Sequence, residues 1–267
     1  MKNKEELWVL KVGGKVLEDE MALATFLDQL ATSGKRFILV HGGGKHASAL
    51  AEKLGIPQQM VDGRRITDEA TLELALMSYA GLLNKKVVAQ LQGRGINAVG
   101  LSGADGNTVP AMKRPVGDID YGWVGDPIPG EVNKLFLLTL LHGNLSPVFC
   151  ALTHDKMGHM LNTNADTMAQ TLAIAMSHHY RVKLLYLFEK KGVLRDLDRE
   201  DSLIPLIRRT DIQALSDTGV ISEGMLPKLQ NAAKAVEAGV EAVLIGAASQ
   251  LPHILSDEAE SATHVID

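Results

Sequence analysis

Two glycine-rich turns near the start of the chain constrain its fold more than any other feature. The strand-like run 7–11 leads into Gly13-Gly14, and the strand-like run 36–41 leads into Gly42-Gly43-Gly44. Glycine lets backbone N–H groups approach an anion closely, and a helix after the turn adds the positive end of its dipole. The pair predicts a phosphate cradle at the carboxyl edge of one parallel sheet.

One such turn alone is also an ordinary connection from strand to helix, so the prediction rests on its repetition. Neither turn spells G-x-x-x-x-G-K-[ST], and neither spells G-x-G-x-x-G. A P-loop NTPase and a dinucleotide-binding dehydrogenase are therefore both disfavoured.

Helical and strand-like segments alternate along the whole chain. This order predicts an α/β fold, a three-layer αβα sandwich with a mainly parallel central sheet. Because Pro-rich and Ser-rich linkers are absent from the sequence, we expect two lobes that share the sheet, residues 1–177 and 178–267. The expected helices are 20–32, 45–54, a long one capped by Thr67 and ending near Gly93, 133–142, 165–176 and 226–238; the expected strands are 7–11, 36–41, 98–101, 146–150, 182–188 and 242–246, with a hairpin region around 103–125.

Composition narrows the class of partner. The chain has 267 residues and a formal net charge of −5, which makes nucleic acid an unlikely partner. An anionic substrate must then be held by local lysines and arginines. No apolar stretch approaches the roughly twenty residues of a membrane span, and the N-terminus lacks an apolar signal region, so we expect no membrane contact and a cytoplasmic location. Cys150, the one cysteine, ends an apolar run and is expected in the core.

Several polar residues could carry chemistry. Asn162, Asn164 and Asp166 cluster where a helix begins. Asn164 could simply cap that helix, but capping leaves the other two unexplained, which favours a role for Asp166 in orienting cations. Lys228 lies in the first turn of a helix, where its positive charge opposes the helix dipole. An ordinary surface lysine is therefore the less favoured interpretation.

Arg65 has two interpretations that the residues leave open. It could grip a ligand carboxylate with both arms of its guanidinium, or it could be an exposed charge on a hairpin. The histidines show no recognised metal-binding spacing, so no metal-ligating residue is assigned.

Six motifs in order carry a family resemblance. Between Lys11 and about Gly246 the chain resembles the amino acid kinase family, whose fold is that of the carbamate kinases. The motifs are Lys11-Val12-Gly13-Gly14, His41-Gly42-Gly43-Gly44, Gly63-Arg64-Arg65-Ile66-Thr67, Tyr121-Gly122-Trp123-Val124-Gly125, Asn162-Thr163-Asn164-Ala165-Asp166 and Gly224-Met225-Leu226-Pro227-Lys228.

The resemblance implies ATP-dependent phosphorylation of the side-chain carboxylate of N-acetyl-L-glutamate, giving N-acetyl-L-glutamyl 5-phosphate in arginine biosynthesis. A carboxylate is already ionised at neutral pH, so the nucleophile needs no general base. The resemblance also implies the roles of the residues. Lys11, Lys228 and Asp166 would be catalytic; Gly43, Gly44, Arg65 and Asn162 would bind the acylglutamate; Lys11, Gly14, Gly44 and Lys228 would bind ATP, with Mg²⁺ bridging its phosphates.

Three departures from the family pattern limit what the resemblance implies. Residues 188–193 replace the usual Asp-Val-x-Gly-Val type of turn, and residues 246–249 lack the Asp-Gly-Arg run that is frequent in relatives. Arg64 stands where relatives usually have an aliphatic residue, and this extra cation raises the hypothesis of an N-succinyl instead of an N-acetyl substrate, with a solvent-facing arginine as the alternative.

Other activities and assemblies remain open. The alternatives are a glutamate 5-kinase, a kinase of an N-blocked aminoadipate, and a non-catalytic sensor of an amino acid or nucleotide. Arginine-inhibited relatives carry an N-terminal helix before the first strand. Because the first strand here starts at about Leu7, the resemblance implies a homodimer that is insensitive to arginine.

Overall fold

The computed structural model describes residues 4–61, 64–196, 199–217, 225–258 and 260–267. In this part of the chain one sheet runs through the molecule in the order β12-β14-β13-β11-β1-β2-β8-β5. All its neighbouring strands are parallel except β13 and β14. The strands are β1 (Glu6–Val12), β2 (Phe37–His41), β5 (Ala98–Leu101), β8 (Ser146–Cys150), β11 (Arg181–Phe188), β12 (Leu206–Arg208), β13 (Ala242–Ala247) and β14 (Thr263–Ile266).

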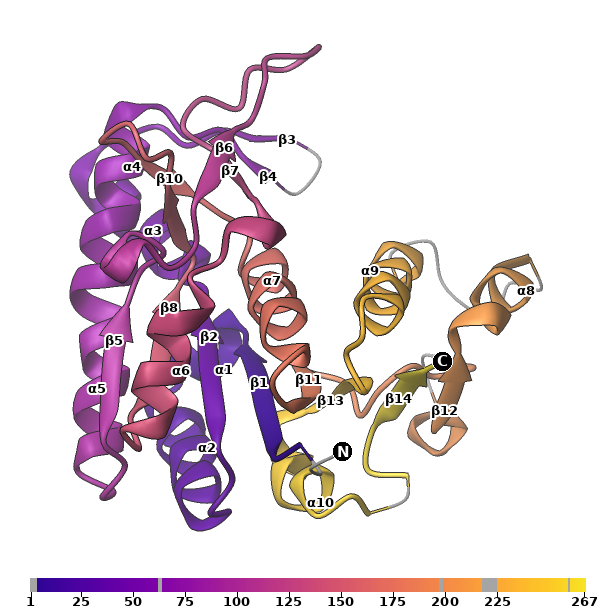
Figure 1. Cartoon of the computed structure of the whole chain (residues 1–267). Helices are drawn as coiled ribbons and strands as arrows, with labels where there is room; N and C mark the ends of the chain where they lie inside the picture. Colours follow the sequence, from indigo (N-terminus) through magenta and orange to yellow (C-terminus); the bar gives the residue numbers. More distant parts are fainter. Residues whose placement is uncertain (1–3, 62–63, 197–198, 218–224, 259) are drawn as a thin grey trace.

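Helices cover both faces of this sheet, as Figure 1 shows. The face that carries Leu10 and Leu39 packs against α2, α5 and α10, and the face that carries Val9 and Val40 packs against α6, α7 and α9. The predicted three-layer sandwich is therefore confirmed. The helices are α1 (Gly14–Glu18), α2 (Glu20–Thr32), α3 (Gly44–Leu54), α4 (Glu69–Ala75), α5 (Asn84–Gln92), α6 (Lys134–His142), α7 (Ala165–Ser177), α8 (Ile212–Asp217), α9 (Leu226–Glu237) and α10 (Leu251–Leu255).

The predicted long helix differs from the observed one in two respects. Its N-cap is Asp68, whose carboxylate accepts the Thr71 N–H at 2.8 Å, so the prediction of Thr67 as the cap was wrong. Thr67 is held in an extended ribbon because its N–H and C=O bond to Tyr121 and Trp123. The middle of the helix is a π-helix, η1 (Leu76–Leu83), which the sequence did not predict.

Three short hairpins extend from the carboxyl edge of the sheet (Figure 1). They are β3 (Met60–Val61) with β4 (Arg64–Arg65), β6 (Ala111–Lys113) with β7 (Gly125–Pro127), and β9 (Leu152–His154) with β10 (Met160–Asn162). Gly122 links two of them: its φ is +69°, and a Cβ there would lie 2.3 Å from the Thr67 carbonyl oxygen. Only glycine fits this crossing.

Short 3₁₀ turns complete the described elements, namely η2 (Asp105–Asn107), η3 (Pro129–Glu131), η4 (Glu200–Ser202), η5 (Arg209–Asp211) and η6 (Ala248–Gln250). Cys150 is fully buried, as predicted, and burial raises the pKa of its thiol to about 12. Among the described helices, none has the length and apolar character to cross a bilayer.

Candidate active site

The two glycine turns lie side by side. β1 and β2 are parallel neighbours with Val12 opposite His41, so the turns that follow them meet at one edge of the sheet. A Cβ built on Gly14 would come within 3.9 Å of the Lys45 side chain, which belongs to the second turn's helix. Helix α3 begins at Gly44 and directs its free N–H groups to this edge.

Lys11 and Asp166 meet beside these turns. Lys11 lies near the end of β1, Asp166 lies in the first turn of α7, and their ammonium and carboxylate groups are 2.8 Å apart. Asp166 Oδ1 is buried and accepts no directed hydrogen bond from any residue that the structure describes, so this ion pair is its main compensation. The Tyr186 hydroxyl donates to the Asp166 backbone carbonyl at 3.3 Å. Burial, helped by the Asp166 charge, raises the Tyr186 pKa and keeps the phenol neutral.

Phe188 brings the two lysines of the site together. It ends β11, and its ring centroid lies 4.0 Å from Lys228 Nζ and 5.6 Å from Lys11 Nζ. Lys228 stands in the first turn of α9, so residues from distant parts of the sequence converge on one ring. Asp166 pairs with Lys11, and within the described residues it has no ion pair with Lys228. Sequence reasoning missed Phe188; an aromatic residue at the carboxyl end of a buried strand was the available signal.

Arg65 lies against the second glycine turn. Its Nη2 donates to the Gly44 carbonyl at 2.8 Å and to Ser48 Oγ at 2.9 Å, and its Nη1 donates to Gln58 Oε1. Tyr79 packs on the same turn, where a Cβ on Gly43 would lie 2.4 Å from Tyr79 Cδ1. Burial raises the Tyr79 pKa despite the nearby Arg65 charge. The turn is thus enclosed by a cation and a neutral phenol.

Asn162 belongs to the same neighbourhood through Thr67. Its amide Nδ2 donates to Thr67 Oγ1 at 3.0 Å, and its backbone N–H donates to the Trp123 carbonyl at 2.8 Å. Thr67 is two residues from Arg65, so both predicted acylglutamate-binding side chains are fixed on adjoining extended segments. Asn164 caps α7 by accepting the Thr167 N–H, as predicted.

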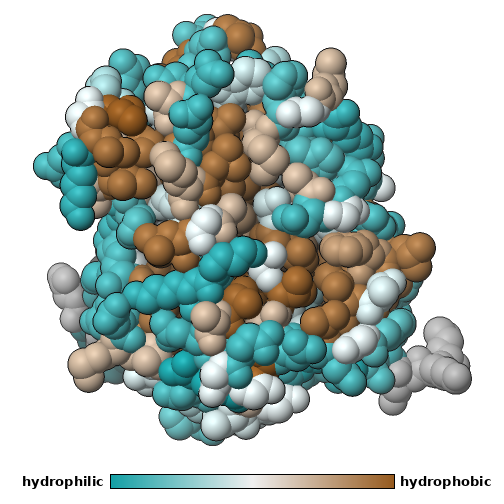
Figure 2. Space-filling model, turned by 90° about the vertical axis from the view of Figure 1, so that its left-hand side faces the viewer, coloured by the Kyte–Doolittle hydropathy of each residue, from teal (hydrophilic) through white to brown (hydrophobic). Residues whose placement is uncertain are grey.

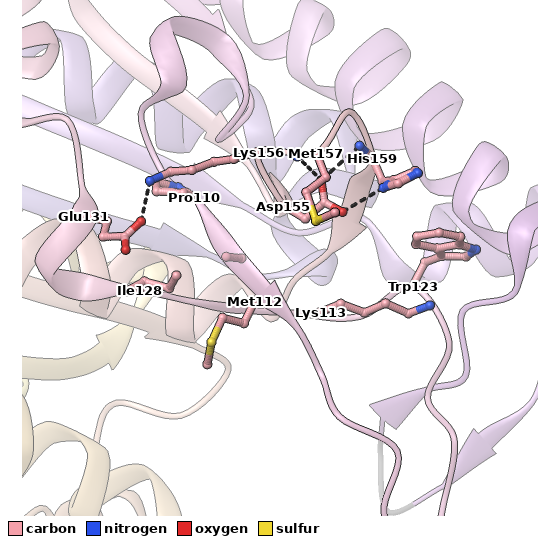
Figure 3. Close-up of a pocket in the computed structure, with 11 residues that line it drawn as sticks. Pro110, Met112, Lys113, Trp123, Ile128, Glu131, Asp155, Lys156, Met157 and His159 are labelled. Carbon is pink, nitrogen blue, oxygen red and sulfur yellow. Dashed lines mark hydrogen bonds and ion pairs between the residues drawn. The ribbon is translucent and has the colours of Figure 1, made fainter.

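A cavity of about 590 Å³ lies outside this cluster, around Trp123 (Figure 3). There the Lys113 ammonium sits 3.9 Å from the indole centroid, and ion pairs join Glu131 to Lys156 and Asp155 to His159. The cavity contains neither a glycine turn nor the Lys11–Asp166 pair. The sheet edge, and not this cavity, is therefore the candidate active site.

Two of the positions that depart from the family pattern lie on the exposed surface. Glu189 pairs with Lys15 at 2.7 Å across an exposed surface, and Arg64 is exposed. Gly63 and Gly224, which open two of the matched motifs, lie outside the described residues.

Known proteins are similar to this chain in sequence and in fold. The model of the amino acid kinase family matches residues 6–247. Acetylglutamate kinase of Bacteroides fragilis is 50% identical over 250 residues, which cover 94% of this chain and 95% of that protein. The Streptococcus mutans UA159 protein smu.665 has a TM-score of 0.76 at 29% identity, with 98% of each chain covered. Carbamate kinase of Giardia lamblia bound to AMP-PNP has a TM-score of 0.70 at 14% identity and covers 100% of this chain and 99% of its own, which places the two in one fold.

Proposed function

The chain belongs to the amino acid kinase family, and we propose that it phosphorylates the side-chain carboxylate of N-acetyl-L-glutamate with ATP. The product is N-acetyl-L-glutamyl 5-phosphate, an intermediate on the way to arginine. The near full-length identity to acetylglutamate kinase carries this assignment. The Lys11–Asp166 pair beside two glycine turns supports it, because phosphoryl transfer depends on positioned charge.

The site must bring two anions together, since both the acceptor carboxylate and the γ-phosphate are charged. Lys11 and Lys228 converge on Phe188 and offset the charge that develops on the transferring group and leaving oxygen. Asp166 fixes the direction of Lys11. The backbone N–H groups of Gly14 and Gly44 bind the γ-phosphate. No general base is required because the acceptor is already ionised.

The acylglutamate lies against the second turn in this proposal. Arg65 already directs Nη2 at the Gly44 carbonyl and can turn its guanidinium to a ligand α-carboxylate. Asn162 binds near the α-amide, and Gly43 and Gly44 border the ligand. All four residues precede residue 178, whereas Phe188 and Lys228 follow it. In this proposal residues 1–177 bind the acylglutamate and form the dimer, and residues 178–267 bind ATP, whose γ-phosphate reaches Gly14 and Gly44 of the N-terminal lobe.

Mg²⁺ accompanies ATP in this proposal. Within the described residues, no cluster of three His, Cys, Asp or Glu side chains forms a metal cage. The chain therefore suits an ion that is held by the nucleotide phosphates and water. The bound ion would neutralise phosphate charge, while Lys11 and Lys228 supply the fixed positive charge of the protein.

A homodimer is the proposed assembly. β5 ends the sheet and leaves one edge of its backbone for pairing with another strand. Exposed Met77 and Leu82 on η1 and Leu135 on α6 belong to the helices on either side of this edge. Figure 2 views this side of the molecule and shows apolar residues spread across it. The use of ATP and the link to arginine synthesis favour a cytoplasmic location.

The first test measures ATP-dependent acyl phosphate formation, trapped with hydroxylamine, on N-acetylglutamate, N-succinylglutamate, glutamate and aspartate. We expect acylated substrates to exceed free amino acids by about 100-fold or more in kcat/KM, because Asn162 binds near the α-amide, which a free amino acid lacks. Turnover of a free amino acid alone would reassign the chain to a sister kinase.

The same assay decides the acyl group. Exposed Arg64 could accept the second carboxylate of a succinyl group. N-acetylglutamate turned over as well as or better than N-succinylglutamate would exclude that role for Arg64. Lys228→Met addresses the sensor alternative, since a kinase should lose turnover and a sensor should keep ligand binding unchanged.

A further inference from the structure

His41 ends β2 directly before the second glycine turn, yet its imidazole points away from the cluster of Lys11 and Asp166. Side chains alternate along a strand, so His41 shares the sheet face of Leu39, which packs against α2 and α5. The ring is fully buried there. A buried imidazole needs partners, and both of its nitrogens have one.

The hydrogen bonds of His41 fix its proton. The Gly42 carbonyl, 2.7 Å from Nδ1, can only accept, so Nδ1 carries the hydrogen. The Val148 carbonyl, 2.9 Å from Asn84 Nδ2, can also only accept, so the Asn84 amide donates on this side. Its second N–H reaches His41 Nε2 at 3.1 Å. The imidazole is therefore neutral and in one tautomer, consistent with burial lowering its pKa to about 4.

Pinning the Gly42 carbonyl orients the next N–H group. In a trans peptide the carbonyl of Gly42 and the N–H of Gly43 belong to one plane and point in opposite directions. With the oxygen held on the α5 face, the Gly43 N–H points to the α7 face, where Lys11 pairs with Asp166. Across the described residues this N–H has no acceptor. It is left free for a ligand.

The edge of the sheet is shaped to admit Asn84. A Cβ on Gly100 of β5 would lie 2.0 Å from Asn84 Oδ1, so a side chain there would displace the amide. Lys85 donates to both Asn84 Oδ1 and the Gly100 carbonyl, which completes the amide's partners. The buried Asn84 thus has a defined position from which to hold the imidazole.

We propose that His41 and Asn84 are positioning residues for phosphoryl transfer, which orient the Gly42–Gly43 peptide so that its N–H faces the reacting anionic groups. Neither residue touches substrate. The inference rests on the proposed kinase function. It adds a buried chain of two hydrogen bonds, from Asn84 of α5 to His41 and from His41 to the Gly42 carbonyl, which we call the relay.

Kinetics test the relay with matched variants. His41→Leu should lower kcat by about 30-fold with little change in KM for ATP, because it frees the peptide to turn. His41→Asn should stay within about 5-fold of the wild type, since its amide N–H can replace Nδ1–H. Val40→Ala, a core change on the opposite face, controls for lost stability and should keep kcat within about 2-fold. A His41→Leu loss no larger than that of Val40→Ala would overturn the proposal.

Isotope labelling of glycine allows the Gly42–Gly43 peptide to be observed directly by NMR. The chain has three glycine–glycine peptide bonds, 13–14, 42–43 and 43–44, so glycine labelled with ¹³C at the carbonyl and ¹⁵N gives coupled amide signals from Gly14, Gly43 and Gly44 alone. Adding Mg²⁺ with AMP-PNP and then N-acetylglutamate should shift the Gly43 signal in the wild type and in His41→Asn. The shift should fall by about half or more in His41→Leu and in Asn84→Leu, where the peptide is released.

The outcomes separate the two proposals. A wild type that neither turns over substrate nor shows shifts would refute the kinase assignment, and the relay with it. A wild type that is active, with Gly43 shifts unchanged in both leucine variants, would refute the relay alone. Asn84→Leu keeps the test decisive if His41→Leu does not fold.

Discussion

Phe188 is the residue on which the proposed catalytic lysines converge. Its ring offers a negative face to the ammonium groups of Lys228 and Lys11. Phe188→Leu removes that face but keeps an apolar side chain at the end of β11. We expect kcat to fall by about 2- to 30-fold, the range for a cation–π contact of about 0.5 to 2 kcal/mol. Phe188→Tyr retains the ring and is the control. Equal activity of the two variants would show that the ring does not orient the lysines.

Glu6, at the opposite end of β1, sets the response of the fold to acid. Burial opposes its charge, but hydrogen bonds from Lys35 and Trp8 and the charge of Lys183 outweigh burial and hold the Glu6 pKa at about 2. A depressed pKa contributes stability that is present above the unfolded value of 4.5 and is lost as the pH falls toward 2. We expect about 1 kcal/mol of the free energy of unfolding to disappear in this window, after allowance for solvent screening.

Urea unfolding at pH 6 and pH 3 measures this contribution. Glu6→Gln should flatten the decline between these values, because the variant has no carboxylate to titrate. Glu5→Gln is the matched control, since Glu5 is exposed and its ion pair with Arg36 is long, at 3.6 Å. Parallel pH profiles for the wild type and Glu6→Gln would show that other groups set the acid limit.

At the scale of elements, the π-helix η1 shapes the second glycine turn. It places Tyr79 so close to Gly43 that an added Cβ would lie 2.4 Å from Tyr79 Cδ1 and 2.9 Å from Leu83 Cδ1. Gly43→Ala should therefore destabilise the protein by about 1 to 3 kcal/mol, as overpacking does, and reduce turnover. Thermal unfolding and the hydroxylamine assay measure both effects.

Two further variants isolate the cause. Gly117→Ala enters open space and should be nearly neutral. Combining Gly43→Ala with Tyr79→Ala removes the ring that the new methyl meets, so the pair should be less destabilising than the sum of the single changes. Additive losses would mean that Gly43 is required for its backbone alone.

The elements also show what sequence could predict. The bounds of α2 and β8 follow from apolar periodicity and glycine stops, and both match the prediction. The π-helix could not be found, since its i→i+5 hydrogen bonding is rare and no residue type in this segment marks it. Nor could Thr67 and Asp68 be distinguished as caps, because both residue types cap helices and tertiary bonds to Tyr121 and Trp123 decided between them.

The site residues likewise fall into those that the sequence could predict and those that it could not. Glycine turns and Arg65 were visible as local patterns, and the ordered motifs supplied the proposed roles of Lys11, Asp166 and Lys228. Phe188 and the His41–Asn84 pair were not visible, because their meaning lies in contacts between residues far apart in the sequence. Strands β12 and β14 were also missed, being short segments at the edge of the C-terminal part of the sheet.

At the scale of the whole molecule, the sheet joins the site to the proposed dimer surface. The glycine turns follow β1 and β2, and two strands further on β5 forms the open edge. Asn84 begins α5, directly after the π-helix that exposes Met77 and Leu82. A partner that covers this edge would therefore fix the helix that holds His41.

Met77→Glu tests that assembly. Met77 is 53% exposed on η1, so a charge there costs the monomer little but would be buried unpaired in a dimer that uses this face. We expect sedimentation velocity to show a dimeric wild type and a largely monomeric variant at micromolar concentration. Met112→Glu changes a methionine that is 62% exposed on the β6 hairpin and should remain dimeric. Loss of the dimer in Met112→Glu but not in Met77→Glu would move the interface to the hairpin face, and a monomeric wild type would refute the homodimer.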